Sequence, residues 1–566
     1  MENNNIPTAA PETKESSRYS INKSELLKKV FSLRGLIIIF MIISLVNIGY
    51  YILFPSRGEF HADSTDTLMW AQATYDSGSI LNEEFEYACL LPFGGQWIMV
   101  PLIAIFGVSM TTQVVGMFIF FLIFIISLFA MLRTMKISLN WSLFTIAVVP
   151  AMLSCSKKLR EIFWGHIIYY SLGMLYAFIG LALIFKIINI IENGKPDPAR
   201  KKKFIIFSAV LLAWCILAGA NQLEILTLFL LPAIGALIAE RFFCFKKYSS
   251  RNELFANLIL IGTVIIGTGI GYLWGNVIAG DITAPYASGA SNLTSTDDWW
   301  EHLSRFFPHL AYLLGMENPG GLALSSAEGI NAVLRIMISV VLIVVPIITT
   351  ILYPKIKSRH IRIFIFFHWV MTALVMIGYI CGGLSSANWR LSPIVCTSVI
   401  MVLILAQWIY TQCSNKKRLC VLTLVPVLVI SALTLNDIRK MPADYNQHSG
   451  LYVVADYLEN NNLTYGYATF WNANSLTVIS DSKSKVRSIR VSDEGEYSIN
   501  YYQSQRSWFD DQPNQENYFL LLNEGEYSNI KNNNNLVLQI PHTEANVEGY
   551  TILVFNENII HAQQWN

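Results

Sequence analysis

Residues Thr112 to Leu132 read TQVVGMFIFFLIFIISLFAML, and this stretch decides the fold of the chain. It carries no charged side chain. Its length matches the roughly 20 apolar residues that an α-helix needs to cross a hydrocarbon core of about 30 Å. Because backbone polar groups inside that core must pair within the protein, the stretch is predicted to be a transmembrane helix.

Similar stretches recur along the whole chain. Hydrophobic residues make up 53% of it and charged residues only 14%, whereas soluble domains carry about 25% charged residues. We expect a mainly α-helical, polytopic transmembrane bundle of about eleven spans, and a soluble globular enzyme is excluded. The expected spans are residues 35–54, 112–132, 141–155, 167–191, 204–219, 222–240, 254–278, 332–353, 361–381, 391–410 and 419–435.

The distribution of basic residues predicts the orientation in the membrane. Lys and Arg gather in alternate connections, most densely in the run Arg200-Lys201-Lys202-Lys203, and such connections stay on the cytoplasmic side. A multi-pass cell-membrane protein with a polar cytoplasmic tail at residues 1–34 and an outer C-terminus is therefore expected. The net charge of only +1 argues against a nucleic-acid partner.

Three outer segments are too long to be simple connectors. The loop 55–111 contains a short apolar stretch at 97–108, interrupted by Pro101, which favours a half-inserted helix. The loop 279–330 contains STDDWWEHLSRFFPHL, whose aromatic side chains suit a helix at the membrane surface. Residues 436–566 are polar and predict a small extracytoplasmic α/β domain. Its expected helices are 450–460 and 472–479, and its expected strands are 465–470, 486–491, 518–522, 536–540 and 551–555.

Two carboxylates in the first outer loop are the strongest catalytic candidates. Asp63 and Asp66 lie three residues apart, which places them on one face if the segment is helical. Such carboxylates can accept a proton from a hydroxyl, or can hold a divalent cation together with His61. The structural alternative is that Asp63 or Ser64 caps the helix that follows.

A basic cluster on the outer side breaks the charge rule. Lys157, Lys158 and Arg160 follow the third span directly, with Glu161 and His166 beside them. Cations at this surface can bind phosphate oxygens, and Arg can do so with two hydrogen bonds. The alternative is that lipid headgroups of the outer leaflet neutralise these charges.

Three further polar residues lie at the ends of later spans. Asn221 and Glu224 occupy the short connection between the fifth and sixth spans, where a carboxylate indicates a functional site by default. Arg390 precedes the tenth span and is followed by Pro393. Its alternative role is to extend to lipid headgroups.

Together these features resemble the C-type glycosyltransferase (GT-C) superfamily of polytopic membrane enzymes. The resemblance rests on the acidic first loop with DTLMWAQATYDSG at residues 66–78, on the Pro-containing helix that ends in FGVS, on Arg390 before Pro393, and on the outer C-terminal domain. It is nearest to the protein mannosyltransferase and aminoarabinose transferase branch. The acidic pair is separated as Asp-Ser-Thr-Asp here, and Leu391 stands where the family usually has Tyr.

The resemblance implies inverting transfer of a sugar from a polyprenyl-phosphate donor to an extracytoplasmic glycan, lipid or protein. The alternatives are a polysaccharide polymerase or ligase and a non-catalytic transport or assembly protein. The implied base is Asp63 or Asp66, and the only cofactor considered is a divalent cation at these residues and His61. The implied ligands of the donor phosphate are Lys157, Lys158, Arg160 and Arg390. The residues expected to line the substrate site are His61, Glu161, His166, Asn221 and Glu224.

Overall fold

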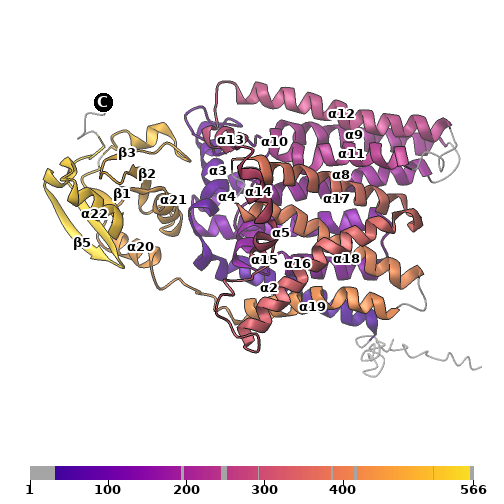
Figure 1. Cartoon of the computed structure of the whole chain (residues 1–566). Coiled ribbons are helices and arrows are strands. Elements are labelled where there is room, and N and C mark those ends of the chain that lie inside the picture. The colour runs from indigo at the N-terminus through magenta and orange to yellow at the C-terminus, as the bar shows by residue number, and fades with distance from the viewer. Residues whose placement is uncertain are drawn as a thin grey trace, which may run out of the picture.

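A computed structural model describes residues 32–192, 197–243, 251–290, 292–383, 387–412, 417–513 and 515–560. It consists of a bundle of long helices and a sheet domain at one end of that bundle (Figure 1). Nearly all of the expected polar tail at residues 1–34 lies outside the described residues.

The bundle confirms the predicted transmembrane helices. Ten described helices are long and apolar enough to cross a membrane, or eleven if one bent pair counts as a span. The helices of the bundle are α2 (Leu33–Leu53), α5 (Met110–Thr134), α6 (Leu139–Met152), α8 (Tyr169–Glu192), α9 (Pro198–Ala220), α10 (Gln222–Ile225), η4 (Leu226–Leu230), α11 (Leu231–Phe243), α12 (Arg251–Ala279), α16 (Ala327–Ile351), α17 (Arg359–Cys381), α18 (Ser392–Gln412) and α19 (Lys417–Lys440). Segments far apart in the sequence pack together, as α2 does with α6, and α11 with α17.

The third expected span differs from the prediction. Helix α6 ends at Met152, and the helical turns α7 (Lys157–Arg160) and η3 (Glu161–Gly165) leave it at 116°. The new direction starts at Ser156, whose hydroxyl caps α7 by accepting from the Leu159 N–H at 3.1 Å. The basic cluster therefore belongs to a helix of its own and not to a simple connection.

The two long connections that the sequence predicts to be outside are largely helical. The first contains η1 (Pro55–Glu59), η2 (Ala62–Thr65), α3 (Asp66–Ser77) and α4 (Gln96–Phe106). Helix α4 is the expected short apolar helix, with Pro101 inside it. The later connection contains α13 (Pro285–Ala290), α14 (Asp298–Ser304) and α15 (Phe306–Leu313), followed along the chain by η6 (Tyr353–Lys355) and η7 (Asn388–Leu391) at the ends of spans.

The C-terminal domain is α/β, as predicted. Its sheet has the order β3-β2-β1-β4-β6-β5, in which β1 pairs in parallel with both β2 and β4. The other three strands pair antiparallel. The elements are α20 (Leu451–Asn460), β1 (Tyr465–Thr469), α21 (Phe470–Ile479), β2 (Lys485–Val491), β3 (Tyr497–Ile499), η9 (Arg506–Phe509), β4 (Tyr518–Asn523), α22 (Glu524–Asn532), η10 (Leu536–Gln539), β5 (His542–Val547) and β6 (Tyr550–Phe555).

One predicted strand of this domain is wrong. The segment expected as a strand at residues 536–540 is the 3-10 turn η10. The Asn535 side chain starts this turn by accepting from the Val537 N–H at 2.9 Å, a local hydrogen bond that competes with a strand ladder. Strands β3 and β5 and helix α22 were not among the predicted elements.

The C-terminal domain is docked on the first outer connection. Trp70 of α3 donates its indole N–H to Gln503 Oε1 at 2.5 Å, and the Gln503 N–H donates to the Glu86 carbonyl at 2.9 Å. At another point the Met110 N–H donates to the Asp481 carboxylate at 3.0 Å. Helix α21 packs against η2 and faces the bundle, whereas α22 and β5 lie on the far side (Figure 1).

Candidate active site

The two carboxylates of the first loop lie at the junction of η2 and α3. Asp63 is in η2, and Asp66 is the first residue of α3. Thr65 occupies the N-cap position of α3, and no side chain caps this helix. The capping role considered for Asp63 or Ser64 is therefore not what the structure has at α3.

Asp66 is a buried carboxylate in an unusual setting. It is 5% exposed, and its Oδ1 has no hydrogen-bond partner among the described residues. An unpaired buried carboxylate is costly unless it is neutral or bound to something else. Burial raises the pKa of Asp66 well above its ordinary range, and the nearby charge of Asp63 raises it further. Such a group is a candidate functional residue.

Asp63 is less deeply buried and has charged neighbours. Burial raises its pKa above the ordinary value. The positive charges of His61 and Lys158 oppose that rise, and the negative charge of Glu161 adds to it. The structure thus brings together four groups that the sequence singled out, from η2 and from the helix that follows α6.

Ion pairs connect the segment that follows α6, which carries Lys158 and Glu161, to its neighbours. Lys158 Nζ lies 2.7 Å from Glu161 Oε2, and His61 Nε2 lies 3.4 Å from the same oxygen. Lys158 also lies 5.1 Å from the ring centre of Trp389, one residue before Arg390. Lys158 therefore connects two parts of the chain. Through Glu161 it is joined to His61, next to η2, and through Trp389 it contacts η7 at the start of α18.

Arg160 has a different environment from the two lysines. Its guanidinium donates two hydrogen bonds to Glu59, from Nε at 3.0 Å and from Nη2 at 2.5 Å. Tyr51 donates its hydroxyl to the same carboxylate at 2.6 Å. This ion pair holds α7 against η1 and occupies the hydrogen-bonding edge of Arg160.

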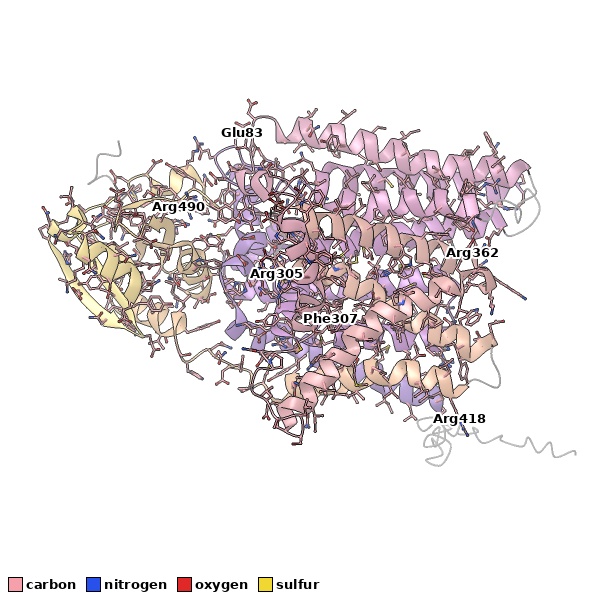
Figure 2. All side chains as sticks on the ribbon, viewed as in Figure 1. Glu83, Arg305, Phe307, Arg362, Arg418 and Arg490 are labelled. Atoms are coloured by element: carbon pink, nitrogen blue, oxygen red, sulfur yellow. The ribbon has the colours of Figure 1, made fainter. Side chains whose placement is uncertain are left out.

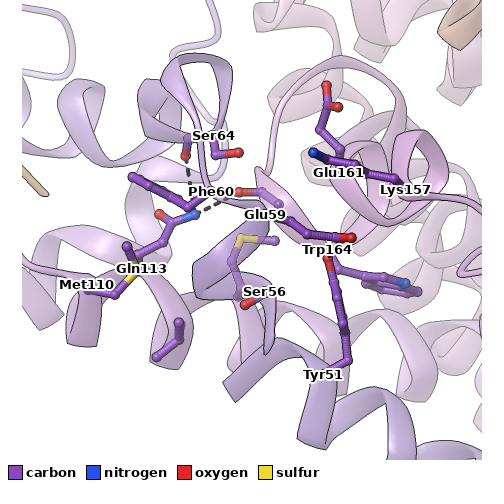
Figure 3. Close-up of a pocket in the computed structure, with 13 residues that line it drawn as sticks. Tyr51, Ser56, Glu59, Phe60, Ser64, Met110, Gln113, Lys157, Glu161 and Trp164 are labelled. Atoms are coloured by element: carbon purple, nitrogen blue, oxygen red, sulfur yellow. Dashed lines mark hydrogen bonds between the residues drawn. The ribbon is translucent and has the colours of Figure 1, made fainter. Parts of the chain in front are cut away.

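Lys157 lines a narrow cavity beside this pair. The cavity is bounded by Glu59, Ser64, Gln113 and Glu161 among others (Figure 3). Gln113 of α5 donates its side-chain N–H to the Ser64 carbonyl at 3.2 Å and to the Gly165 carbonyl at 2.7 Å. In Figure 3, Lys157 and Glu161 lie across the cavity from Gln113. Gln113 thus ties the carboxylate loop to the end of η3.

Arg390 lies in η7, next to the Trp389 ring that contacts Lys158. It donates to the Gly378 carbonyl at 2.5 Å and hydrogen-bonds to the Tyr170 side chain. The charges of Arg390, Asp63 and Asp66 all act on Tyr286 of α13. Trp389, the residue before Arg390, contacts Lys158, so the start of η7 lies beside the ion pairs of Glu161 although more than 200 residues of chain separate Trp389 from Lys158.

The remaining predicted residues have separate roles. Asn221 is buried and fixes the first outer loop, because its Oδ1 accepts from the Phe93 N–H at 2.9 Å. Burial raises the pKa of the Cys89 thiol, and the negative charges of Glu224 and Asp66 raise it further. His166 is buried, and its burial lowers its pKa to about 4, so it is neutral at pH 7. Its Nδ1 has no hydrogen-bond partner among the described residues.

Several residues of the site carried no signal in the sequence. Tyr286 and Tyr502 are the clearest examples, because their rings lie 5.6 Å apart. Burial raises the pKa of both hydroxyls, and the charges of Asp63 and Asp66 raise it further. Tyr502 comes from the C-terminal domain, so this domain forms part of the site. Tyrosines are abundant in the chain, and only their meeting in space distinguishes these two.

The described residues do not form a ready metal site. No group of three or more His, Cys, Asp or Glu side chains suited to a metal ion is found in the described ranges. The divalent cation expected at Asp63, Asp66 and His61 stays a prediction, and no chemical step is derived through it.

Comparison with known proteins places the fold. No protein-family model and no curated protein matches the chain. ArnT, an aminoarabinose transferase, from Cupriavidus metallidurans and bound to undecaprenyl phosphate, is similar over 92% of this chain and 98% of its own, with a TM-score of 0.51 and 10% identity. The Archaeoglobus fulgidus oligosaccharyltransferase tethered with an acceptor peptide is similar over 94% of this chain and 75% of its own, with a TM-score of 0.47 and 9% identity. The ArnT likeness confirms the predicted resemblance to the C-type glycosyltransferases at the level of the fold.

Proposed function

We propose that this chain is a membrane glycosyltransferase that moves a sugar from a polyprenyl-phosphate donor to an acceptor at the outer face of the membrane. The observation that carries the proposal is the cluster of Asp63 with His61, Glu161 and Lys158 at the contact with the C-terminal domain, where Lys158 also contacts Trp389 beside Arg390. The shared fold with ArnT, which was solved with undecaprenyl phosphate bound, supports a lipid-phosphate donor.

Asp63 is proposed as the general base. It is more accessible than Asp66, and its raised pKa makes it a better proton acceptor than an ordinary carboxylate. The acceptor hydroxyl gives its proton to Asp63 while its oxygen forms a bond to the anomeric carbon of the sugar. The bond between that carbon and the donor phosphate oxygen breaks, and its electron pair leaves with the lipid phosphate. Attack from the face opposite the phosphate inverts the anomeric configuration.

The leaving phosphate is proposed to bind Lys157, Lys158 and Arg390. Their positive charges stabilise the negative charge that develops on the phosphate, and preorganised charges of this kind are often the largest contribution to catalysis. Arg160 is already paired with Glu59, so its proposed part in phosphate binding is to fix α7 and the two lysines on it. Asp66, buried next to Asp63, is proposed to orient the base or the acceptor.

Exchange of the carboxylates tests the proposal. Cells that lack the gene are complemented with the wild-type chain, Asp63→Asn or Asp66→Asn, and their envelope glycans, lipids and proteins are compared by mass spectrometry. We expect the wild type to add one sugar mass to one class of molecule. Loss of the general base in Asp63→Asn lowers the rate by about 10²–10⁴-fold, and Asp66→Asn removes the carboxylate proposed to orient the base or the acceptor, so both variants should lose that addition.

Purified Asp63→Asn should keep the wild-type melting temperature and its affinity for undecaprenyl phosphate, because the amide is nearly isosteric with the carboxylate. Glu83→Gln, an exposed carboxylate in the same outer connection, is the matched control and should behave as wild type. Normal sugar addition by a stable Asp63→Asn, Asp66→Asn double variant would rule out this site.

A further inference from the structure

The C-terminal domain contains a large groove at one edge of its sheet. Strands β2, β1 and β4 are parallel, so their carboxyl ends meet at the same edge. The groove is lined there by Phe470 and Trp471, which follow β1, by Arg490 at the end of β2, and by Glu526, which follows β4. In open α/β sheets ligands bind beyond the carboxyl ends of the strands, where the order of connections reverses. Here the chain leaves β1 towards β2 on one side, and β4 lies on the other.

The lining of the groove combines an exposed aromatic surface with many polar groups. Trp471 is 63% exposed, although large apolar side chains are usually covered. The charged side chains are one guanidinium, Arg490, and three carboxylates, Glu494, Glu496 and Glu526. The groove measures about 1480 Å³, which exceeds the roughly 300–1,000 Å³ of pockets for single small ligands. It has room for a chain of linked polar units.

A series of aromatic rings connects this groove to the candidate active site. The rings of Trp471 and Phe470 lie 5.3 Å apart, and those of Phe470 and Tyr502 lie 5.1 Å apart. Tyr502 lies 5.6 Å from Tyr286, and both tyrosines feel the charges of Asp63 and Asp66. Helix α21, whose first residues Phe470 and Trp471 line the groove, also packs against η2, the segment that carries Asp63.

We infer that this groove binds the acceptor as an oligosaccharide chain, with Trp471 stacking on a sugar remote from the reacting one. The inference rests on the proposed function, which it extends by naming the acceptor class. A pyranose has an apolar C–H face, which suits a flat indole, and a rim of hydroxyls, which suits carboxylates and amides. A lipid tail needs an apolar groove, and the excess of carboxylates disfavours a strongly anionic glycan. The aromatic series marks the course of the chain from Trp471 towards Asp63.

Binding of glycans to the full-length chain tests this inference. The probe is the neutral oligosaccharide fraction that mild acid releases from the envelope of the source cells, and binding to detergent-purified protein is followed by saturation-transfer NMR. Loss of one aromatic contact weakens binding by up to about tenfold. We therefore expect Trp471→Ala to bind the probe about tenfold more weakly than wild type. Trp300→Ala, which changes an even more exposed tryptophan on α14 outside the groove, should bind it as wild type does.

The same preparations are titrated with undecaprenyl phosphate, which separates this inference from the proposed function. Weaker glycan binding by Trp471→Ala alone, with unchanged undecaprenyl phosphate binding, supports the groove. Absence of glycan binding by wild type, or equal binding by Trp471→Ala, overturns the groove and leaves the donor site standing. Glycan binding without any undecaprenyl phosphate binding contradicts the proposed donor but retains the groove as a glycan site.

Discussion

Asp63 and Asp66 are three residues apart, yet their surroundings give them different chemistry. Asp66 is buried, and one of its carboxylate oxygens has no hydrogen-bond partner among the described residues. Asp63 keeps some exposure and shares its surroundings with His61, Lys158 and Glu161. Two carboxylates whose environments differ in this way are suited to different roles, one chemical and one supporting.

The charged neighbours of Asp63 lead to a prediction about pH. A base must be ionised, so its rate falls as the pH falls through its pKa, and burial places this acid limb above the range of an ordinary Asp. Glu161→Gln removes a negative charge that raises the pKa of Asp63, and should move the acid limb to lower pH. His61→Gln removes a positive charge that lowers this pKa, and should move the limb to higher pH. The profile of kcat/KM against pH measures both shifts.

Shifts of equal size and the same sign in these two variants would contradict Asp63 as the titrating base. Glu83→Gln serves again as the control, since it should leave the acid limb unchanged.

At the level of elements, the short helix α7 is the piece of structure on which the proposed donor binding depends. It leaves the direction of α6 by 116°, begins at the Ser156 cap, and is held in place by the Arg160–Glu59 ion pair. This arrangement places Lys157 beside a cavity and Lys158 beside Glu161. Two lysines in consecutive positions thus serve neighbouring parts of one site.

The proposed phosphate contacts of α7 can be measured without knowledge of the sugar. Lys157→Gln together with Lys158→Gln should weaken the binding of undecaprenyl phosphate by between about tenfold and about a hundredfold, because hydrogen bonds to charged groups contribute about 1.5–3 kcal/mol. Microscale thermophoresis on the purified protein in detergent measures this affinity. The control is Lys201→Gln with Lys202→Gln, in the first turns of α9.

Equal affinity in the α7 variant and in wild type would show that the two lysines only anchor lipid headgroups. Weakening by the α9 control to the same extent would show that undecaprenyl phosphate binds through general charge and not at a defined site.

At the level of the whole molecule, hydrogen bonds join the C-terminal domain to the first long connection of the bundle. Trp70 and Glu86 of that connection bind Gln503 of the domain, and Tyr502 next to it enters the site. Arg490 of this domain lies at the opposite end of the molecule from Arg362 and Arg418 (Figure 2). The candidate site is therefore on one side of the membrane, which the distribution of Lys and Arg predicts to be the outer side.

Cysteine labelling tests this orientation. Asp493→Cys on the domain and Lys357→Cys at the other end of the bundle are both exposed positions. They are placed separately in a background in which Cys244, Cys381 and Cys413 are Ser. A membrane-impermeant maleimide should label Asp493→Cys in intact cells and Lys357→Cys only after lysis. The reverse pattern would place the site in the cytoplasm and exclude an extracytoplasmic acceptor.

Much of this protein could be predicted from local sequence alone. Long uncharged stretches such as Thr112 to Leu132 predict helices that cross a membrane, because the cost of unpaired backbone groups in hydrocarbon leaves no other structure. The polar composition after residue 436, together with helical and strand segments that alternate along the chain, predicts a separate α/β domain. Asp63 and Asp66 were recognisable because they lie three residues apart directly after a span, and the basic cluster because it breaks the rule that basic residues gather on the cytoplasmic side.

Only the tertiary structure decided how these groups act together. It paired Arg160 with Glu59, brought Trp389 beside Arg390 into contact with Lys158, and placed Tyr286 against Tyr502. None of these meetings follows from spacing, since the partners lie on elements far apart in the chain. Burial and contact between distant segments depend on how the helices and the sheet pack, and that packing determines which side chains lose water and which find a partner.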